Sequence, residues 1–304
     1  MTLLKLYRPM FAAAAIAVSC GAVASAQYKF VKIDIPGSLG TAAFGISNKN
    51  EIVGYYWTGS PDSPVYHGFL RTNGHPAVLV YPIDDPSAEG YTDLTSINSN
   101  GDVVGTYQAT SVAMEGLLLE AGQFTTISVP GCTQTLLNGI NDKGELVGSC
   151  PTSGGGVLAW FGGPGGYSNF LPPGAVSSFA LANNTAGDIA GSYFDGTTSH
   201  GLVIHPDYHY TVLDYPGATG TYATGISDKD VVAGSYYIND SYYGFLYHAG
   251  KYTTVSIPGA SNIQLGQINK NGWFVGSYTT RQGASVTFYA KPSPGPSVLV
   301  DSEE

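Results

Sequence analysis

The sequence contains none of the local motifs that mark a common enzyme class. It has no Gly-x-Ser-x-Gly nucleophile elbow, no His-Glu-x-x-His, no Cys-x-x-Cys, no phosphate loop and no dinucleotide fingerprint. No segment after the first residues is apolar enough to cross a membrane, and none shows sustained helical periodicity with caps. These absences exclude a helical solenoid and remove any positive argument for catalysis. They do not exclude an enzyme whose site is assembled from separate repeats.

Charge is also scarce, and most of it is negative. Charged residues make up 11% of the chain, and 22 acidic side chains oppose 12 basic ones. A negative surface repels phosphate backbones, so we expect no nucleic-acid partner. Low charge together with abundant Gly, Tyr, Ser and Thr is typical of an exported all-β protein with a hydroxyl-rich surface.

The first 26 residues resemble a secretory signal. Lys5 and Arg8 form a short positive region, residues 10–18 are apolar but too short to span a bilayer, and residues 24–26 read Ala-Ser-Ala. We expect cleavage after position 26 and a secreted protein, extracellular or periplasmic. An alternative makes Cys20 a lipidated N-terminus, although the larger aliphatic residue usual three positions earlier is missing.

One phrase recurs six times along the chain. Each copy reads approximately Phe/Tyr-x-x-Ile-x-x-Pro-Gly, then Gly-Ile-Asn-x-x-Gly-x-Val-Val-Gly-x-Tyr, then Gly-Phe-Leu. The last glycine of the middle phrase falls at Gly54, Gly105, Gly148, Gly191, Gly234 and Gly276. A period of about 43 residues indicates a repeat architecture.

The third unit shows what one repeat contains. Segments rich in β-branched, aliphatic and aromatic residues alternate with turn residues, and we expect strands at 124–129, 135–140, 145–150 and 157–161. Four strands in about 43 residues is the pattern of a β-propeller blade. The predicted fold class is therefore all-β, a six-bladed β-propeller of four-stranded blades, with an open β-solenoid as the alternative.

The ends of the repeat region favour a closed ring. The mature chain opens with a lone strand, residues 30–35, and the sixth unit stops without such a strand. The first strand can complete the last blade, which leaves no open edge. We therefore expect a propeller domain at 27–291, a disordered tail at 292–304 and a monomer.

The repeated phrases resemble the HAF repeats of bacterial extracellular proteins. The resemblance rests on residues 138–148 (Asn-Gly-Ile-Asn-Asp-Lys-Gly-Glu-Leu-Val-Gly), on residues 225–234 and on His67-Gly-Phe69, and it covers residues 30–290. It implies an exported repeat protein and brings no established catalytic residues. Asn183 departs from the pattern by replacing the usual Ile, and Asn50 and Asp230 replace the turn Gly.

Two cysteines follow the signal, Cys132 and Cys150, and an oxidising compartment allows them to pair. If residues 141–144 form a four-residue hairpin loop, Ile140 lies opposite Glu145, and position 135 lies opposite Cys150. Cys132 is then within disulfide reach. We expect a disulfide that staples one repeat, with two buried thiols as the alternative.

Repeated polar residues are poor functional candidates, because a residue that recurs in every repeat is most simply explained by a structural role in each blade. The turn at residues 141–144 and its relatives resemble calcium loops but lack the run of carboxylates and the distal Glu. A structural calcium ion is therefore not supported, and no cofactor is expected. His205 and His209 have metal-like spacing but fall at a position where other units have a turn, so we expect no metal site.

Two insertions distinguish the first repeats from the others. The segments 54–68 and 82–105 are longer than their counterparts, and in a propeller the corresponding loops emerge on one face, so we expect them side by side. Aromatic rings beside carboxylates suit sugar faces and hydroxyls. The predicted ligand-binding residues on this face are Trp57, Asp62, Tyr66, His67, Asp84, Asp85, Glu89, Tyr91, Tyr242 and Tyr243; the second insertion also carries Asp93.

The sequence thus favours an exported, non-catalytic binding module for a glycan, for cell-envelope material or for a protein. A carbohydrate-active hydrolase or lyase using Asp62, Asp84, Asp85 or Glu89 is one alternative. A purely structural surface protein is the other.

Overall fold

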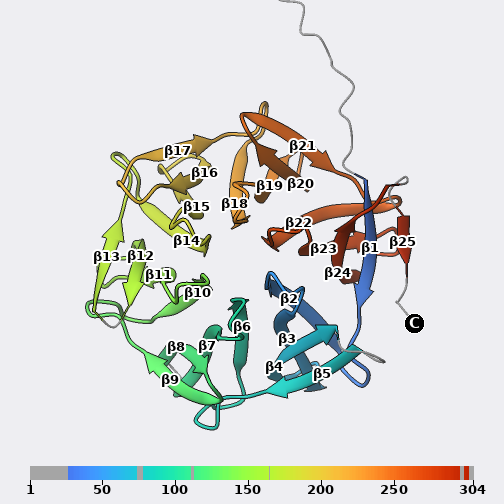
Figure 1. Cartoon of the computed structure of the whole chain (residues 1–304), viewed down its shortest axis with the longest axis horizontal. Helices are drawn as coiled ribbons and strands as arrows, with labels where there is room; N and C mark the ends of the chain where they lie inside the picture. The colour runs from blue at the N-terminus through green and yellow to red at the C-terminus, as the bar shows by residue number, and fades with distance from the viewer. Residues whose placement is uncertain (1–26, 74–77, 111–112, 164, 295–297, 301–304) are drawn as a thin grey trace, which may run out of the picture.

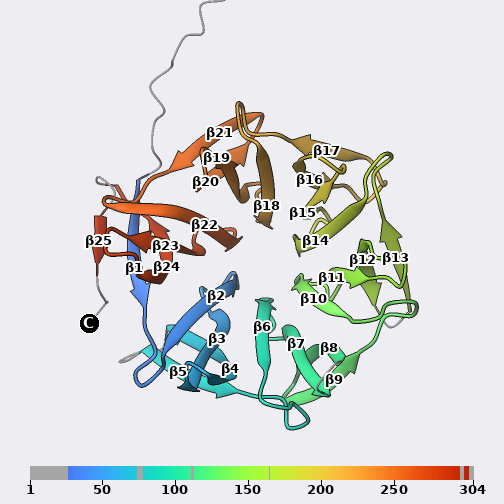
Figure 2. The same cartoon turned by 180° about the vertical axis from the view of Figure 1, so that it is seen from behind.

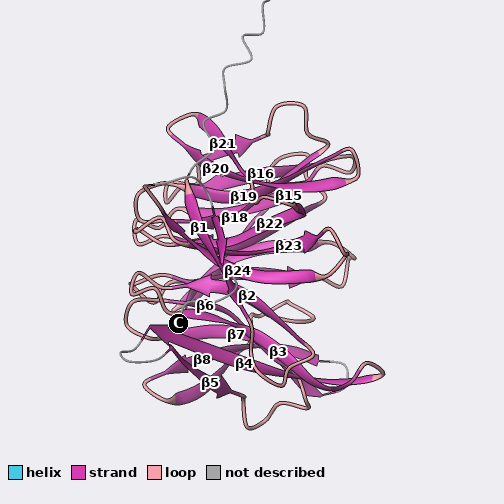
Figure 3. Ribbon diagram, turned by 90° about the vertical axis from the view of Figure 1, so that its right-hand side faces the viewer, coloured by secondary structure: helices cyan, strands magenta, loops and turns pink. Residues whose placement is uncertain are grey.

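The structure is a computed structural model that describes residues 27–73, 78–110, 113–163, 165–294 and 298–300. The predicted signal, residues 1–26, lies outside them. The described residues form strands and loops without a helix (Figure 3). They therefore contain no helix of the length and hydrophobicity that a bilayer crossing needs.

Successive groups of strands are arranged around a central axis (Figure 1; Figure 2 from behind). The first three groups are the sheets β2–β5, β6–β9 and β10–β13, and the first of them begins with β2 (Gly40–Ile46). Their other strands are β3 (Ile52–Ser60), β4 (Ser63–Asn73), β5 (Val78–Ile83), β6 (Thr92–Ile97), β7 (Val103–Thr110), β8 (Ala113–Glu120), β9 (Gln123–Ile127), β10 (Leu136–Ile140), β11 (Leu146–Pro151), β12 (Val157–Gly163) and β13 (Gly166–Phe170).

The remaining groups complete the arrangement. They consist of β14 (Ser177–Asn183), β15 (Ile189–Phe194), β16 (Ser199–Ile204), β17 (Tyr210–Leu213), β18 (Gly220–Ile226), β19 (Val232–Ile238), β20 (Ser241–His248), β21 (Lys251–Val255), β22 (Ala260–Ile268), β23 (Phe274–Thr280), β24 (Ser285–Pro292), β1 (Tyr28–Ile33) and β25 (Val298–Val300). A single parallel bridge, Ser199 to Gly220, joins β14–β17 to β18–β21. Elsewhere each group is a sheet of its own, so the described chain is a β-propeller built of four-stranded blades.

The strand at the start of each sequence repeat lies in the blade of the preceding repeat. Residues 124–129, predicted as the first strand of the third unit, supply β9, the outer strand of the β6–β9 sheet. Likewise β1 pairs antiparallel with β24, from Tyr28 opposite Pro292 to Ile33 opposite Thr287. The repeat visible in the sequence is thus offset by one strand from the blade.

Apolar side chains fill the space between neighbouring blades. Val31 and Tyr289, from the β22–β24 and β1 sheet, share a buried cluster with Ile46, Ile52 and Phe69 of the β2–β5 sheet. A similar cluster spans the β6–β9 and β10–β13 sheets. The core is therefore a ring of interfaces between sheets.

The Gly-Ile-Asn phrase forms the turn of each inner hairpin. The Oδ1 atom of Asn141 accepts hydrogen bonds from the N–H groups of Lys143 (3.0 Å) and Glu145 (3.0 Å), and its Nδ2 donates to the carbonyl of Asn184 in the next blade (2.8 Å). One side chain therefore caps its own turn and ties two blades together. Asn98 and Asn269 donate to the next blade in the same way.

The predicted four-residue loop at 141–144 is wrong by one residue. Ile140 pairs with Leu146, so the turn spans five residues because the Asn141 side chain holds the N–H of Glu145. A bulge at Asn138 restores the register, and Leu136 lies opposite Ser149.

The two turn positions that replace glycine adopt the backbone conformation that glycine has in the other units. Asn50 and Asp230 have φ values of 64° and 57°, against 79° for Gly144 in the same turn. Asn and Asp tolerate this left-handed conformation better than other residues with a Cβ.

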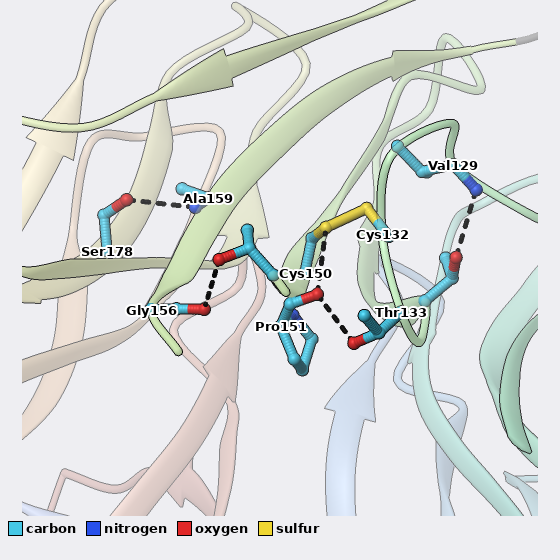
Figure 4. Close-up of a disulfide and its surroundings, with 10 residues drawn as sticks. Val129, Cys132, Thr133, Cys150, Pro151, Gly156, Ala159 and Ser178 are labelled. Carbon is cyan, nitrogen blue, oxygen red and sulfur yellow. Dashed lines mark hydrogen bonds between the residues drawn. A yellow bond between two sulfur atoms is a disulfide. The ribbon is translucent and has the colours of Figure 1, made fainter. Parts of the chain in front are cut away.

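Cys132 and Cys150 form a disulfide, with their Cα atoms 5.3 Å apart (Figure 4). It joins the loop that follows β9 to the end of β11. The N–H and Oγ1 of Thr133 both donate to the carbonyl of Pro151 beside it. The bridge fastens one blade to the outer strand of its neighbour.

The predicted disordered tail needs one correction. Val298–Val300 forms β25, which pairs in parallel with β1. Prolines at 292, 294 and 296 suggested an unpaired segment, but three β-branched or aliphatic residues follow them and form a short strand beside β1.

We expect Asn141→Ala to lower the free energy of unfolding by about 2–4 kcal/mol, because several hydrogen bonds of a buried amide are lost. Urea unfolding measures the change. Asn169→Ala on the exposed face of β13 is the control and is expected to change stability by less than about 0.5 kcal/mol. Equal stability of the two variants would contradict the linking role of Asn141.

Reduction of the disulfide is expected to lower the free energy of unfolding by about 3 kcal/mol, from the entropy of a short closed loop. Urea unfolding with and without a thiol reductant measures this. The Cys132→Ala/Cys150→Ala variant should match the reduced protein and not respond to reductant. A response in that variant would show that the reductant acts elsewhere.

Candidate functional site

The two insertions lie side by side on one face of the propeller. The N–H of Tyr66, from the β3–β4 hairpin, donates to the carbonyl of Gly90 in the β5–β6 loop (3.0 Å). A parallel bridge joins Tyr66 to Tyr91. The face that carries residues 61–62 and 84–91 is called the insertion face below; the opposite face carries the Gly-Ile-Asn turns and is called the turn face.

The first insertion is a longer hairpin rather than a longer loop. Ser60 pairs with Ser63, so only Pro61 and Asp62 form the turn, and the extra residues extend β3 and β4. Tyr, Trp, Thr and Val in this segment favour an extended strand. The extension holds its aromatic side chains at defined positions along a ladder.

Four aromatic rings gather on this hairpin and the adjoining loop, and they are called the aromatic cluster. The ring centres of Tyr66 and Tyr91 are 5.2 Å apart, Tyr55 and Tyr66 5.5 Å, Tyr55 and Trp57 5.9 Å, and Trp57 and Tyr66 6.2 Å. All four side chains are partly exposed. The Trp57 ring covers Gly40, where a Cβ would come within 2.1 Å of it. The cluster is therefore a packed but solvent-accessible aromatic surface.

Asp93 in β6 adds a carboxyl group to this cluster. Its Oδ1 is buried and has no hydrogen-bond partner, while Tyr91 bonds the carboxyl group. Burial raises the pKa of Asp93 to about 7, although the bond from Tyr91 opposes this change. Burial, together with the charge of Asp93, also raises the pKa of Tyr55.

His67 and Asp84 are bonded to each other rather than directed at the cluster. The Nδ1 of His67 lies 2.8 Å from Oδ2 of Asp84, and its ring stacks on Tyr56. The same arrangement recurs where His200 stacks on Tyr193 and bonds Asp214 at 2.8 Å. Because this set of Tyr, His and Asp occurs in two blades, we attribute it to the structure of the blade and not to ligand binding.

The other predicted carboxylates have separate positions. Asp85 is buried, and its Oδ1 accepts the N–H of Ser87 within the same turn (2.7 Å). Asp62 is exposed at the hairpin tip, and the exposed Glu89 bonds Gln108 through its backbone.

Tyr242 and Tyr243 lie apart from the aromatic cluster. They belong to β20, and the β22–β24 sheet separates their blade from the β2–β5 blade (Figure 1). Tyr242 contacts Tyr222 and Tyr237, whereas Tyr243 stacks on Tyr236. The structure thus brings Trp57, Tyr66 and Tyr91 together and leaves this pair elsewhere on the ring.

The histidines with metal-like spacing are each bonded to an aspartate. His205 Nδ1 lies 2.7 Å from Asp188, and His209 Nδ1 lies 2.9 Å from Asp207. Among the described residues, no group of three or more His, Cys, Asp or Glu side chains is arranged to hold a metal ion.

Tyr55 is the cluster residue that the sequence did not indicate. Tyr55 stands where the other units have Thr106, Ser149, Ser192, Ser235 and Ser277. A comparison of the six units at this position identifies it as exceptional. Asp93 is likewise unusual, because its counterparts are Ala42, Leu136, Phe179, Tyr222 and Gln264.

Comparison with known proteins supports the fold. No protein-family model and no curated protein matches the chain significantly. A protein assigned as TolB from Agrobacterium tumefaciens aligns with a TM-score of 0.57 and 12% identity over 85% of this chain and 91% of its own. TolB from Acinetobacter baumannii gives 0.52 and 10% over 83% and 66%. The β-propeller domain of the Trilobed protease from Pyrococcus furiosus gives 0.51 and 8% over 84% and 95%.

The buried carboxyl group of Asp93 predicts a pH dependence of stability. Between about pH 4 and pH 7 the folded protein holds a proton on Asp93 that the unfolded chain has lost, so stability falls as the pH rises through this range. Asp93→Asn should remove this fall and be more stable than the wild type at pH 8, on the order of 2 kcal/mol.

Thermal or urea unfolding from pH 4 to pH 8 checks this prediction. Asp62→Asn, at an exposed position on the neighbouring hairpin, is the matched control and should follow the wild type. Parallel profiles for all three proteins would show that Asp93 does not titrate in this range.

Proposed function

We propose that this protein is a secreted or periplasmic binding module that takes carbohydrate or cell-envelope material on the insertion face. The observation that carries the proposal is the aromatic cluster, in which the centre of each of four partly exposed rings lies 5.2–6.4 Å from those of two or three others. Flat aromatic faces stack on the apolar faces of sugar rings, and nearby polar groups bond hydroxyls.

The carboxylates of the site favour binding over catalysis. Hydrolysis of a glycoside uses two carboxyl groups that face the same bond from about 5 to 10 Å apart. Asp84 is bonded to His67, Asp85 is bonded inside its turn, and the Oδ1 atom of Asp93 is buried. None of these contacts supports an acid and base pair around the aromatic surface.

The same proposal includes the architecture expected from the sequence. We take the ring to have six blades, with β14–β17 and β18–β21 as separate blades and β1 as the outer strand of the last. The pairing of β1 with β24 supports this, as does the hydrogen bond from Asn269 to Ser47 across the first and last repeats. A monomeric, exported HAF-repeat protein is the corresponding identity.

Binding to a glycan and polysaccharide array tests the function. We expect Trp57→Ala and Tyr66→Ala each to weaken binding about fivefold to thirtyfold, because each removes a stacking surface worth about 1–2 kcal/mol. Tyr208→Ala is the matched control, since Tyr208 is 54% exposed in a loop on the turn face.

Mass spectrometry of each bound glycan distinguishes the remaining functions. Unchanged glycans indicate a binding module, and cleaved ones would replace it with a carbohydrate-active enzyme. Binding that survives both cluster substitutions, or no binding at all, would contradict the proposal.

A further inference from the structure

The inner strands line a cavity at the centre of the propeller. β2 begins at Gly40, which pairs with Trp57, and ends at Ile46, which precedes the first turn on the turn face. A cavity of about 260 Å³ is lined by residues between these two ends, including Ala42 and Phe44. The space lined by Ile46 and the following turns measures only about 40 Å³. The axial space is thus wider around Ala42 and Phe44 than at the turn face.

Bulges in the inner strands shape the wall of this cavity. Each of these strands shifts register at the same place, and the residues at the shift are Phe44, Thr95, Asn138, Leu181, Thr224 and Gly266. All six line the cavity. Thr95 and Thr224 donate to the carbonyls of Leu137 and Leu265 in the next blade, both at 2.7 Å. These contacts fix the wall.

Gln267 forms the floor of the cavity. It stands where other units have small residues such as Gly45, Gly139 and Gly225, and its side chain is 9% exposed. Its Oε1 accepts a hydrogen bond from Ser96 (3.0 Å), and its Nε2 donates to the carbonyl of Asn138 (3.3 Å). One long amide therefore bridges three inner strands and separates the cavity from the turn face.

The lining of the cavity has the chemistry of a site for a small neutral ligand. It contains no charged side chain, but it offers the exposed amide of Gln264 and the ring of Phe44, which is 37% exposed. Its volume lies just below the roughly 300 Å³ at which pockets for drug-sized ligands begin, so it suits a single ring. A charged group would lose its hydration there without gaining a partner.

The cavity is continuous with the aromatic cluster. The ring centre of Phe44 lies 5.7 Å from that of Tyr55, which contacts Trp57 and Tyr66 in turn. An extended ligand can therefore place one end in the cavity and its next units on the cluster. Phe44 is the only aromatic residue among the six bulge positions.

We propose that the axial cavity binds the terminal ring of a neutral glycan, stacked on Phe44, while the following sugars lie on the aromatic cluster. This inference rests on the proposed function, because it specifies which sugar of the bound glycan is recognised and that this sugar is uncharged. It predicts that a charged terminal sugar is rejected.

Saturation-transfer difference NMR and calorimetry with single sugars test the cavity. The probes are methyl glycosides of neutral hexoses, with glucuronate and glucosamine at the same concentrations. We expect at least one neutral hexoside to bind at least tenfold more tightly than either charged sugar. Phe44→Ala should abolish this binding, and Val176→Ala, at an exposed apolar position on the β13–β14 connection, should not change it.

The outcomes separate the two proposals. Polysaccharide binding that requires Trp57 but not Phe44 would overturn the cavity assignment and leave the proposed function intact. Equal affinity for neutral and charged sugars would also overturn it. No binding of any single sugar or polysaccharide would overturn both. Circular dichroism of Phe44→Ala shows whether that variant is folded, and Phe44→Tyr, which keeps a stacking ring, should retain binding.

Discussion

The asparagine of the repeated Gly-Ile-Asn phrase makes the contact on which the ring depends. Its side chain occupies a buried position at the junction of two blades, donating forward to a carbonyl of the next blade from Asn98, Asn141, Asn184 and Asn269. At Ser47 and Ser227 the side chain is too short for this contact. There the following residue helps to join the blades: Asn48 accepts the N–H of Lys270, and Asp228 accepts that of Thr185. The buried polar groups of the junctions are thereby paired, and the blades keep a fixed spacing.

This arrangement divides the work between the two faces of the propeller. The turn face is occupied by contacts between blades, and little open volume remains at its centre. On the insertion face the hairpins differ in length, since β3 and β4 turn at residues 61–62 whereas β11 and β12 turn between Pro151 and Val157. Tyr55 stands where the other units have Thr or Ser, and Asp93 stands where most of them have an uncharged, apolar or aromatic residue. Phe44 stands where the other units have no aromatic residue. Sequence variation is therefore tolerated on one face, while the contacts of the other hold neighbouring blades together.

The repeats made the blade predictable, because Gly, Asn and alternating apolar residues act locally. The register was harder to predict. The extra turn residue at Glu145 and the bulge at Asn138 offset each other, and both depend on hydrogen bonds made by side chains. The candidate site was predictable only in part. Trp57, Tyr66 and Tyr91 come together as expected from their insertions, whereas the contact of Tyr55 with Phe44 depends on how side chains pack at the axis. His67 and Asp84 were predicted to bind ligand because they lie in the two insertions, although their hydrogen bond joins them to each other.

Strand β1 has a further consequence through its two neighbours. It pairs with β24 along one edge and with β25 in parallel along the other, so the two ends of the described chain meet at one strand on the rim (Figure 1). Tension applied between the ends would load these parallel strands in shear, with the hydrogen bonds of three residue pairs resisting together. The force would enter the propeller at its circumference.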